Sequence, residues 1–549
     1  MTTNASLTAR AGGDPLIPMS ITALREGYGP AALRADAVAG LTVAIVALPL
    51  SMAIAIASGV GPERGLFTAI VGGFLVSLFG GSRFQIGGPA GAFIVLVNAC
   101  VMQTGVEGLM LATFLSGIML TVLGLLRLGS TIRFMPYPVT VGFTSGIGVI
   151  IFASQIKDMI GLRLSGAEPG PIVPKVEALW AARATLSPAA VGVALATVGV
   201  ILAIQRFRPR WPSLLLGIAL VTAASALLGL PVETIASKFG GLPRLLPAPH
   251  LPPLSAEAVS AALPWAASFT LLGAIESLLS AMVADGMSGT LHRSNMELVA
   301  QGIANMGAAI FGGFCVTGTI ARTATNVRSG GRTPMAGMLH ALFVLAFMLI
   351  AAPLAGYIPL AALAGLLGIV AWNMIERHEF AALTRVSKGD ALVLWVTFLV
   401  VVFRDLAEGI VLGFALGGLV FIRRMSEMTG LREGEPVVRD ADTQSADLVT
   451  YHLHGAVFFG SVARLGTVLD RIAQRPRAVL LDVSEVTFVD STGARMILQL
   501  AQKLSSRGGA LVIVGARPAV ETALKAQGLT EPALRYAADA GAAGALLAP

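Results

Sequence analysis

An acidic residue, Glu276, lies inside one of the most apolar stretches of the sequence. No charged residue occurs from Ala258 to Ile275, so its carboxyl group is expected deep inside a membrane span. A charge at that depth costs about 2.5–3.5 kcal/mol on translocon-based scales, and such residues usually face a cavity, a partner or an ion. Glu276 could accept a coupling proton, or hold Na⁺ together with the hydroxyls of Ser277 and Ser280. The alternative is a buried acid that only pairs with a neighbouring helix.

Arg322 is a second charge of interest, because it follows a helix-breaking sequence in the string TGTIARTATN. A guanidinium group stays charged at any working pH and can direct two donors onto a carboxylate or another oxyanion. The alternative is that Arg322 extends with Arg328 toward the cytosolic surface as a topology signal. We favour an anion-binding role, since the arginine follows the interruption so closely.

Two corresponding interruptions break the apolar pattern. Phe-Gly-Gly at 79–81 precedes Gly-Gly-Pro at 87–89, and Phe-Gly-Gly at 311–313 precedes Thr-Gly-Thr at 317–319. Their matching places indicate a duplicated unit of seven spans, and an odd number of spans inverts the second copy. Paired half-helices of this kind present free N–H groups at mid-membrane, where they favour an anion. The alternative is that the glycines only permit close helix packing.

The elements that must position these residues are membrane spans. The chain is 55% hydrophobic and 13% charged, and apolar runs long enough for a bilayer recur along it. Lys and Arg at the span ends fall mostly on one side, which predicts cytosolic termini in an inner (plasma) membrane. The charge of +7 is scattered among these ends, so we expect no nucleic-acid partner. We expect about fourteen spans, near residues 37–59, 62–80, 88–101, 107–127, 138–160, 188–205, 212–230, 262–285, 294–313, 318–328, 334–353, 356–373, 389–404 and 406–422.

The predicted organisation is an all-α polytopic membrane domain followed by a cytosolic α/β domain. Its parts are listed here in order: a cytosolic segment at 1–36, the first repeat at 37–230, an extramembrane connection at 231–261, the second repeat at 262–424 and the α/β domain at 437–549. We expect no catalytic residue, cofactor or metal site, since Cys100 and Cys315 stand alone in apolar segments. His340 is interpreted as a hydrogen-bonded core histidine rather than a proton relay.

The C-terminal domain alternates β-rich runs with amphipathic helices. Asp490, Ser491 and Thr492 fall at a strand-to-helix turn, where a side-chain oxygen can cap free N–H groups. A phosphate on Ser491 or Thr492 would be stabilised there, so these residues form a candidate regulatory site.

These strings together resemble the sulfate-permease (SulP) anion transporters, relatives of prestin. The most specific stretch runs from Asn295 to His340, supported by PVTVGFTSGIGVIIFASQIK in the fifth span and LPLSMAIAIASGV in the first. The C-terminal unit is similar to a STAS domain, and its VDSTGA matches the turn that is phosphorylated in related anti-sigma-factor antagonists.

The resemblance implies two inverted seven-span repeats, with spans 1–4 and 8–11 as a moving core and spans 5–7 and 12–14 as a gate. It also implies a homodimer, and a regulatory protein could bind the STAS domain. It places Glu276 at the acidic position of span eight. The implied substrate site comprises Leu50, Ser51, Pro89, Ala90, Gly91, Thr319, Ile320, Ala321 and Arg322.

One departure concerns the substrate. Many relatives read Pro-Gln-Gly-Met/Leu-Ala-Tyr-Ala in the first span, whereas Pro49 is followed here by Leu50 and Ser51. The missing amide and phenol put sulfate in doubt and resemble the bicarbonate and dicarboxylate branches. We therefore expect proton- or sodium-coupled symport of a small anion, ranked as a dicarboxylate such as fumarate, then bicarbonate, then sulfate. The alternatives are an uncoupled anion channel and a membrane-tethered signalling protein with STAS output.

Overall fold

The chain folds into two units that are described separately. The computed structural model describes residues 16–132, 135–166, 168–209, 211–404, 406–434, 448–472, 478–530, 534–537 and 542. Unit 1 comprises Met1–Phe414 and unit 2 comprises Ala415–Pro549. Two basic residues used for the topology prediction, Arg133 and Arg210, and the predicted domain start at Val437 lie outside the described residues.

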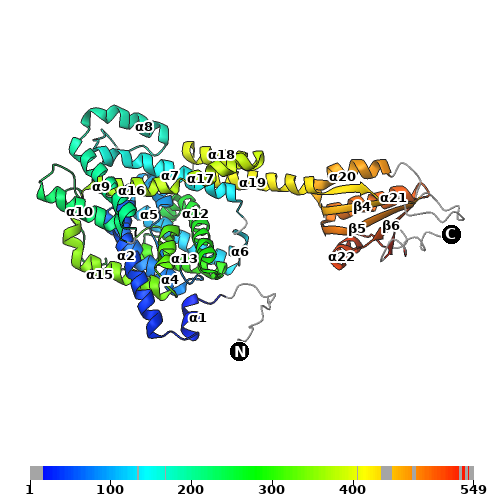
Figure 1. Cartoon of the computed structure of the whole chain (residues 1–549), viewed down its shortest axis with the longest axis horizontal. Coiled ribbons are helices and arrows are strands. Elements are labelled where there is room, and N and C mark those ends of the chain that lie inside the picture. The colour runs from blue at the N-terminus through cyan, green and yellow to red at the C-terminus, as the bar shows by residue number, and fades with distance from the viewer. Residues whose placement is uncertain are drawn as a thin grey trace. The chain divides into compact units, whose positions relative to one another are not determined.

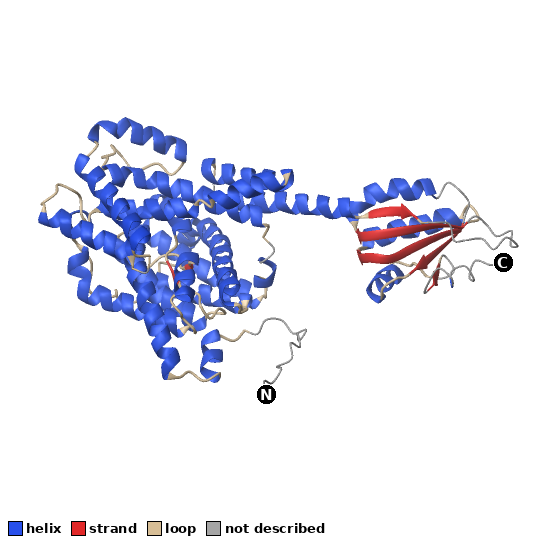
Figure 2. Cartoon of the chain, viewed as in Figure 1, coloured by secondary structure: helices blue, strands red, loops and turns tan. Residues whose placement is uncertain are grey.

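Among the described residues of unit 1, the regular secondary structure is helical apart from two very short strands (Figures 1 and 2). Within the described ranges, nine helices are long and apolar enough to cross a membrane. Its α-helices are α1 (Met19–Arg25), α2 (Pro30–Ala57), α3 (Pro62–Phe67), α4 (Gly73–Phe79), α5 (Ile94–Leu125), α6 (Gly129–Ile132), α7 (Tyr137–Ile160), α8 (Ile172–Ala181), α9 (Pro188–Phe207), α10 (Ser213–Leu227), α11 (Ile235–Phe239), α12 (Ala256–Ser288), α13 (Ser294–Ile310), α14 (Ile320–Arg328), α15 (Met335–Ala355), α16 (Leu360–Met374), α17 (Arg377–Val386), α18 (Lys388–Phe403) and α19 (Leu406–Met428), the last of which continues into unit 2.

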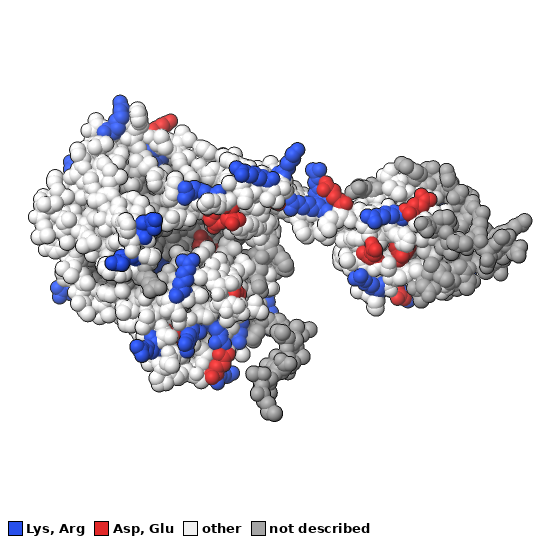
Figure 3. All heavy atoms as spheres, viewed as in Figure 1, with Lys and Arg blue, Asp and Glu red and all other residues white. Residues whose placement is uncertain are grey.

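The surface of unit 1 suits a lipid environment. Large apolar side chains such as Leu227 and Ile350 are exposed, and most of the face seen in Figure 3 carries neither Lys, Arg, Asp nor Glu. Exposed aliphatic side chains in such number would be unfavourable in water but are at no disadvantage in a bilayer.

The helices of unit 1 pack in two groups. In the first group, α5 packs against α12 and α13, and α2 packs against α15. In the second, α7 packs against α16 and α18, and α9 packs against α10 and α16. Helices near the start of each half therefore pack together, as the predicted division into core and gate requires. We call the first set the core group and the second the gate group.

The two interrupted segments meet inside the core group. β1 (Gly87–Gly88) pairs antiparallel with β2 (Thr317–Gly318), through the partners Gly87 with Gly318 and Gly88 with Thr317. A 3₁₀ turn, η2 (Gly91–Phe93), leads from β1 into α5, and α14 follows directly after β2. Both breaks come from glycine-rich sequence, because glycine is a poor helix residue.

The third and fourth expected spans correspond to two helices within α5, which meet at Gly105 with φ 72°. Three local features differ from the sequence-based expectations. The predicted connection at 231–261 contains α11, and α12 already begins at Ala256 because Ser255 caps its first turn. The span expected near 62–80 carries a π-helical turn, η1 (Thr68–Gly72). An amphipathic helix, α17, separates α16 from α18 and was not predicted.

Unit 2 contains a five-stranded sheet in the order β3-β4-β5-β6-β7. Its strands are β3 (Gly430–Glu433), β4 (Leu448–Val457), β5 (Ala478–Val489), β6 (Ala510–Val514) and β7 (Arg535–Ala537), and its remaining helices are α20 (Phe459–Ile472), α21 (Ser491–Ser505) and α22 (Pro518–Ala526). β4 to β7 are mutually parallel, and β3 joins β4 in antiparallel orientation. The sheet thus begins at Gly430, ahead of the expected boundary at Val437, because a strand of four residues gives too short a pattern to detect.

Candidate functional site

The β1–β2 ladder fixes the two half-helix ends against each other. The backbone N–H and the side-chain hydroxyl of Thr319 both donate to the Ile86 carbonyl, at 3.0 and 3.2 Å. The Ile86 N–H donates to the Thr323 hydroxyl oxygen at 3.1 Å. The start of α14 is therefore tied to the segment that precedes α5, and the predicted meeting of the two interruptions is confirmed.

We call the place where the β1–β2 ladder joins the starts of α5 and α14 the junction. Arg322 lies inside this junction and not at a surface. Its side chain is 1% exposed. Nη2 donates to the Ser51 hydroxyl at 3.1 Å and to the Pro89 carbonyl at 3.3 Å. The Nε and Nη1 atoms are buried and have no hydrogen-bond partner in the described part of the chain. The alternative in which Arg322 extends to the cytosolic surface is therefore wrong.

Glycine at position 88 makes room for this guanidinium group. A Cβ atom added at Gly88 would collide with Nη1 of Arg322. The charge thus lies directly over the backbone of β1, beside the N-terminal ends of both half-helices, where helix dipoles also favour negative charge.

The other implied site residues differ in how deeply they are buried at the half-helix ends. Pro89, Ala90 and Thr319 are buried at the half-helix ends, and Leu50 is buried beside Ser51 on α2. Gly91 faces the gate group, since a Cβ there would lie 3.2 Å from Cδ1 of Ile151 and 3.6 Å from Sδ of Met374. Ile320 is half-buried, whereas Ala321 is exposed. The junction therefore brings together most of the implied residues, but the side chain of Ala321 does not enter it.

Glu276 is buried on α12, with 7% of its surface exposed. No described residue forms a hydrogen bond or ion pair with its carboxyl group, so the alternative of a buried acid that pairs with a neighbouring helix is not supported. The expected sodium-binding set of Glu276, Ser277 and Ser280 stays a prediction, and both hydroxyls have hydrogen-bond partners. Ser277 accepts from Nε2 of Gln85 at 2.8 Å, and Ser280 donates to Thr323 at 3.1 Å. Both hydroxyls thus point toward residues at the junction, Gln85 and Thr323.

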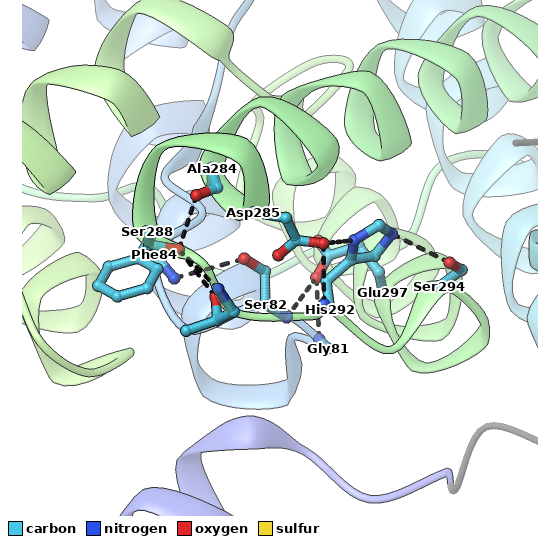
Figure 4. A network of polar contacts seen from close by, with 10 residues as sticks. Gly81, Ser82, Phe84, Ala284, Asp285, Ser288, His292, Ser294 and Glu297 are labelled. Carbon is cyan, nitrogen blue, oxygen red and sulfur yellow. Dashed lines mark hydrogen bonds and ion pairs between the residues drawn. The ribbon is translucent and has the colours of Figure 1, made fainter. Parts of the chain in front are cut away.

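Sequence reasoning missed a second buried carboxylate, Glu297 on α13, which is 0% exposed. Its Oε2 accepts from the backbone N–H groups of Gly81 and Ser82, at 2.8 and 3.1 Å (Figure 4). Its Oε1 accepts from the side-chain amides of Gln85 and Gln301, at 2.8 and 3.0 Å. Four donors satisfy an ionised carboxylate. The available signal was the acid itself, one turn into an otherwise uncharged helix.

Gln85 links this carboxylate to the junction. Its amide nitrogen contacts both Glu297 and Ser277, and a Cβ at Gly318 would collide with the amide. Gln85 therefore packs against β2 and links it to α12 and α13. Polar contacts, and not apolar packing alone, hold the half-helix ends in place.

A second series of polar side-chain contacts stabilises the turn between α12 and α13. Nδ1 of His292 lies 2.6 Å from Oδ2 of Asp285, and its Nε2 lies 3.0 Å from the hydroxyl of Ser294 (Figure 4). The residue types match a hydrolase triad, but Ser294 is 0% exposed and no substrate could reach it. We interpret these three hydrogen-bonded residues as a structural support for the start of α13.

In unit 2, the expected cap is confirmed. Oδ1 of Asp490 accepts from the Gly493 N–H at 2.7 Å, and Oδ2 accepts from the Phe459 N–H at 3.0 Å. Ser491 and Thr492 are exposed in the first turn of α21. Both hydroxyls are accessible to a modifying enzyme.

The fold and the junction define a class of protein. A helical membrane unit with paired interrupted helices, followed by a small α/β unit, is the architecture of an anion transporter with a STAS domain. Sequence comparison agrees, because the sulfate permease family model matches residues 33–397 and the STAS domain model matches residues 440–533. The chain belongs to the sulfate permease family.

Similar proteins include named transporters. The chain is 39% identical over 508 residues to the putative sulfate transporter YvdB of Bacillus subtilis, covering 92% of this chain and 95% of that protein. Against the solved transmembrane domain of the cyanobacterial bicarbonate transporter BicA, the TM-score is 0.64 at 33% identity, covering 70% of this chain and 98% of the other. The murine Slc26a9 anion transporter shares the fold, with a TM-score of 0.84 at 19% identity over 97% of this chain and 94% of the other.

Proposed function

We propose that this protein is a secondary active transporter that binds a small anion at the facing ends of the two half-helices. The observation that carries this proposal is the pair of unpartnered nitrogens, Nε and Nη1, on the buried Arg322. A buried donor without a partner costs about 1–3 kcal/mol, and more when the group is charged. An oxyanion at the junction would satisfy both donors and neutralise the charge.

The division of unit 1 into two helix groups supports alternating access. The anion would be held by the core group, at Arg322, Ser51 and the β1–β2 ladder. Gly91 lies against Ile151 and Met374 of the gate group, so sliding of one group past the other would change which side of the membrane the site faces.

Substrate and coupling ion remain parts of the proposal. Named relatives transport bicarbonate or are described as putative sulfate transporters. A single guanidinium balances one negative charge, which suits bicarbonate. Sulfate and fumarate carry two and would need a further cation or proton. Both termini in the cytosol, a homodimer in the inner membrane, and regulation through Ser491, Thr492 or a protein bound to the STAS domain complete the proposal.

Glu276 is proposed as the coupling residue because its buried carboxyl group has no partner. We expect Glu276→Gln to lose ion-driven accumulation of the anion, since an amide neither takes up a proton nor carries a charge for Na⁺. The measurement is uptake of labelled anion into proteoliposomes under an imposed proton or sodium gradient. Glu257→Gln, at an exposed position of the same helix, is the matched control. Normal accumulation by the Glu276→Gln protein would remove this residue from the coupling mechanism.

Isotope flux tests the proposed function itself. Purified full-length protein in liposomes is offered labelled fumarate, bicarbonate and sulfate in turn. Saturable uptake against a concentration gradient indicates a transporter, and rapid passive conductance indicates a channel. Absence of flux for every anion, combined with a protein that binds unit 2, would favour the signalling alternative.

A further inference from the structure

A buried histidine next to the proposed anion site has no role in the mechanism described so far. His340 on α15 is 0% exposed, and neither ring nitrogen has a hydrogen-bond partner in the described part of the chain. The carbonyl of Gly337, one turn earlier, interacts with the ring but forms no aligned hydrogen bond. The sequence-based expectation of a hydrogen-bonded core histidine is therefore half right, because the residue is buried but unpaired.

Packing places this ring close to the strand that Arg322 covers. A Cβ at Gly73 would lie 3.7 Å from Cε1 of His340 and 2.9 Å from the Gly87 carbonyl oxygen. A Cβ at Gly88, the next residue of β1, would collide with Arg322. His340 and Arg322 thus border adjacent residues of the same short strand.

His340 and Arg322 are two buried polar side chains with unpaired nitrogens in the same region, which is unusual. Buried polar groups are nearly always hydrogen-bonded, and exceptions call for an explanation such as a missing ion or a functional role. An anion bound to Arg322 would account for both groups, because it would pair with the guanidinium and favour a proton on the ring. While Arg322 carries an uncompensated charge, a proton on His340 would add a second positive charge nearby, and like charges in a low-dielectric interior repel strongly.

Because anion binding would cancel that repulsion, we propose that His340 is a proton-binding site that takes up a proton when the anion binds to Arg322. This inference rests on the proposed function and deepens it. The proton comes from the aqueous side to which the site is open, forms an N–H bond on a ring nitrogen of His340, and leaves by the same route when the anion is released. No other bond changes.

The coupling follows from charge alone. Anion and proton each lower the energetic cost of the other, so by linkage they bind together and are released together. The loaded site then holds two positive charges, on Arg322 and His340, which balances a dianion such as sulfate or fumarate.

The elements that pack against α15 carry few charged residues. α15 packs against α2, α3, α4 and η1. α4, η1 and the remainder of α15 carry no charged residue. On α2 and α3 the charged residues are Arg34, Asp36, Glu63 and Arg64. Asp36 is occupied by the N–H groups of Arg332 and Thr333, at 2.6 and 3.1 Å, and Arg64 donates to the Gly312 carbonyl at 2.7 Å.

Calorimetry of the purified full-length protein tests the proposal. Sulfate and fumarate are titrated in buffers of different ionisation enthalpy, which yields the number of protons taken up per anion bound. We expect about one proton fewer per anion bound in His340→Gln, which should still bind the anion, than in the wild-type protein between about pH 5 and 8. His378→Gln, at an exposed position, is the control and should retain the proton.

The outcomes distinguish the two proposals. Anion binding without proton uptake in the wild-type protein would overturn the role of His340 and leave the anion site intact. Proton uptake lost in Glu276→Gln but kept in His340→Gln would place the proton on Glu276 and also overturn it. Failure of both anions to bind would count against the proposed function for these anions.

A second measurement needs no anion. In ¹⁵N-histidine NMR spectra, the His340 signal is assigned by its loss in His340→Gln. We expect His340 to take up a proton at a higher pH in Arg322→Gln than in the wild-type protein, because burial disfavours the charged ring in both proteins but the repelling charge is absent from the variant. The same behaviour in both proteins would overturn the proposal.

Discussion

Arg322 has more hydrogen-bond donors than partners, because its Nε and Nη1 atoms are unpaired although the residue is only 1% exposed. Ser51 and Pro89 occupy one terminal nitrogen only. Planar guanidinium geometry suits an oxyanion better than a lysine ammonium would, because two parallel donors reach two oxygens.

We expect Arg322→Gln to weaken anion binding by about 10- to 100-fold, since a charge-assisted hydrogen bond contributes about 1.5–3 kcal/mol. The measurement is the anion-induced rise in melting temperature of the purified protein, followed by uptake in proteoliposomes. Arg328→Gln, on the same helix but exposed, is the control. Unchanged affinity in Arg322→Gln would exclude this residue from the site.

Asp482 in unit 2 gives a pH-dependent contribution to stability. It stands opposite His452 in the register of β4 and β5, with Oδ2 at 2.9 Å from Nδ1. Partial burial acts to raise the pKa of Asp482, but hydrogen bonds from Ser484 and the interaction with His452 outweigh burial, so the pKa is lowered. The resulting stability is present above the unfolded pKa of about 3.9 and is lost as pH falls through the folded value.

Replacing Asp482 by Asn should therefore flatten the acid side of the stability profile. Melting temperatures of unit 2, measured in the full chain between about pH 3 and 7, should fall more steeply with acid in the wild-type protein than in Asp482→Asn. Asp490→Asn is a less suitable comparison because it alters a helix cap. Parallel profiles for wild type and Asp482→Asn would contradict the prediction.

At the residue scale, the sequence identified charges but not their partners. Glu276 and Arg322 were found because a charge in an apolar run is conspicuous. Glu297 escaped notice because its partners, Gly81 and Ser82, are more than 200 positions away. The hydrogen bonds of Ser277 with Gln85 and of Ser280 with Thr323 were not predicted for the same reason, since the sequence does not show which way a hydroxyl points.

Among the elements, close helix crossings in the core group depend on glycine. α5 and α13 approach so closely that a Cβ at Gly124 would lie 2.7 Å from the Asn295 carbonyl oxygen and 2.8 Å from the Val299 nitrogen. Both atoms belong to the backbone and cannot move aside without moving the helix. Small residues at such crossings are a general feature of membrane helix packing.

The expected result for Gly124→Ala is a loss of about 1–3 kcal/mol of stability through overpacking. Thermal unfolding in detergent measures it as a lower melting temperature. Gly199→Ala on α9, where nothing lies within 4 Å, is the matched control and should be neutral or slightly stabilising. Equal melting temperatures for both variants would show that the crossing can relax.

Most elements were predictable because their signals are local. The expected spans match the observed helices within a few residues, since an apolar run and its glycine, proline or charged ends mark both boundaries. The short strands β3 and β7 and the helix α17 were missed. Strands of three or four residues have too few positions to show an alternating pattern, and their pairing depends on distant segments.

At the scale of the whole molecule, each unit has its own hydrophobic core. In unit 2 the core includes Leu481, Ile497, Leu500 and Ile513, all at most 2% exposed. These residues belong to one cluster of buried side chains. Separate cores predict separate unfolding.

We expect Leu500→Ala to destabilise unit 2 by about 2–5 kcal/mol while protection of the core group in unit 1 stays unchanged. Hydrogen exchange with peptide-level resolution measures both units in one experiment. Gln502→Ala, an exposed neighbour on the same helix, should have little effect on either. Loss of protection in both units together would mean that the chain unfolds as one cooperative body.

The two-residue ladder between β1 and β2 has a consequence for how cargo is carried. Antiparallel pairing, reinforced by Thr319 and Ile86, joins residues from both halves of the chain into a single cradle. In the proposed transport cycle, we expect this cradle to keep its dimensions whichever compartment it opens to, so that its intrinsic preference for cargo is the same on both sides. We then expect any directional bias to arise from the ions that accompany the cargo and from the packing around Gly91, and not from reshaping of the cradle.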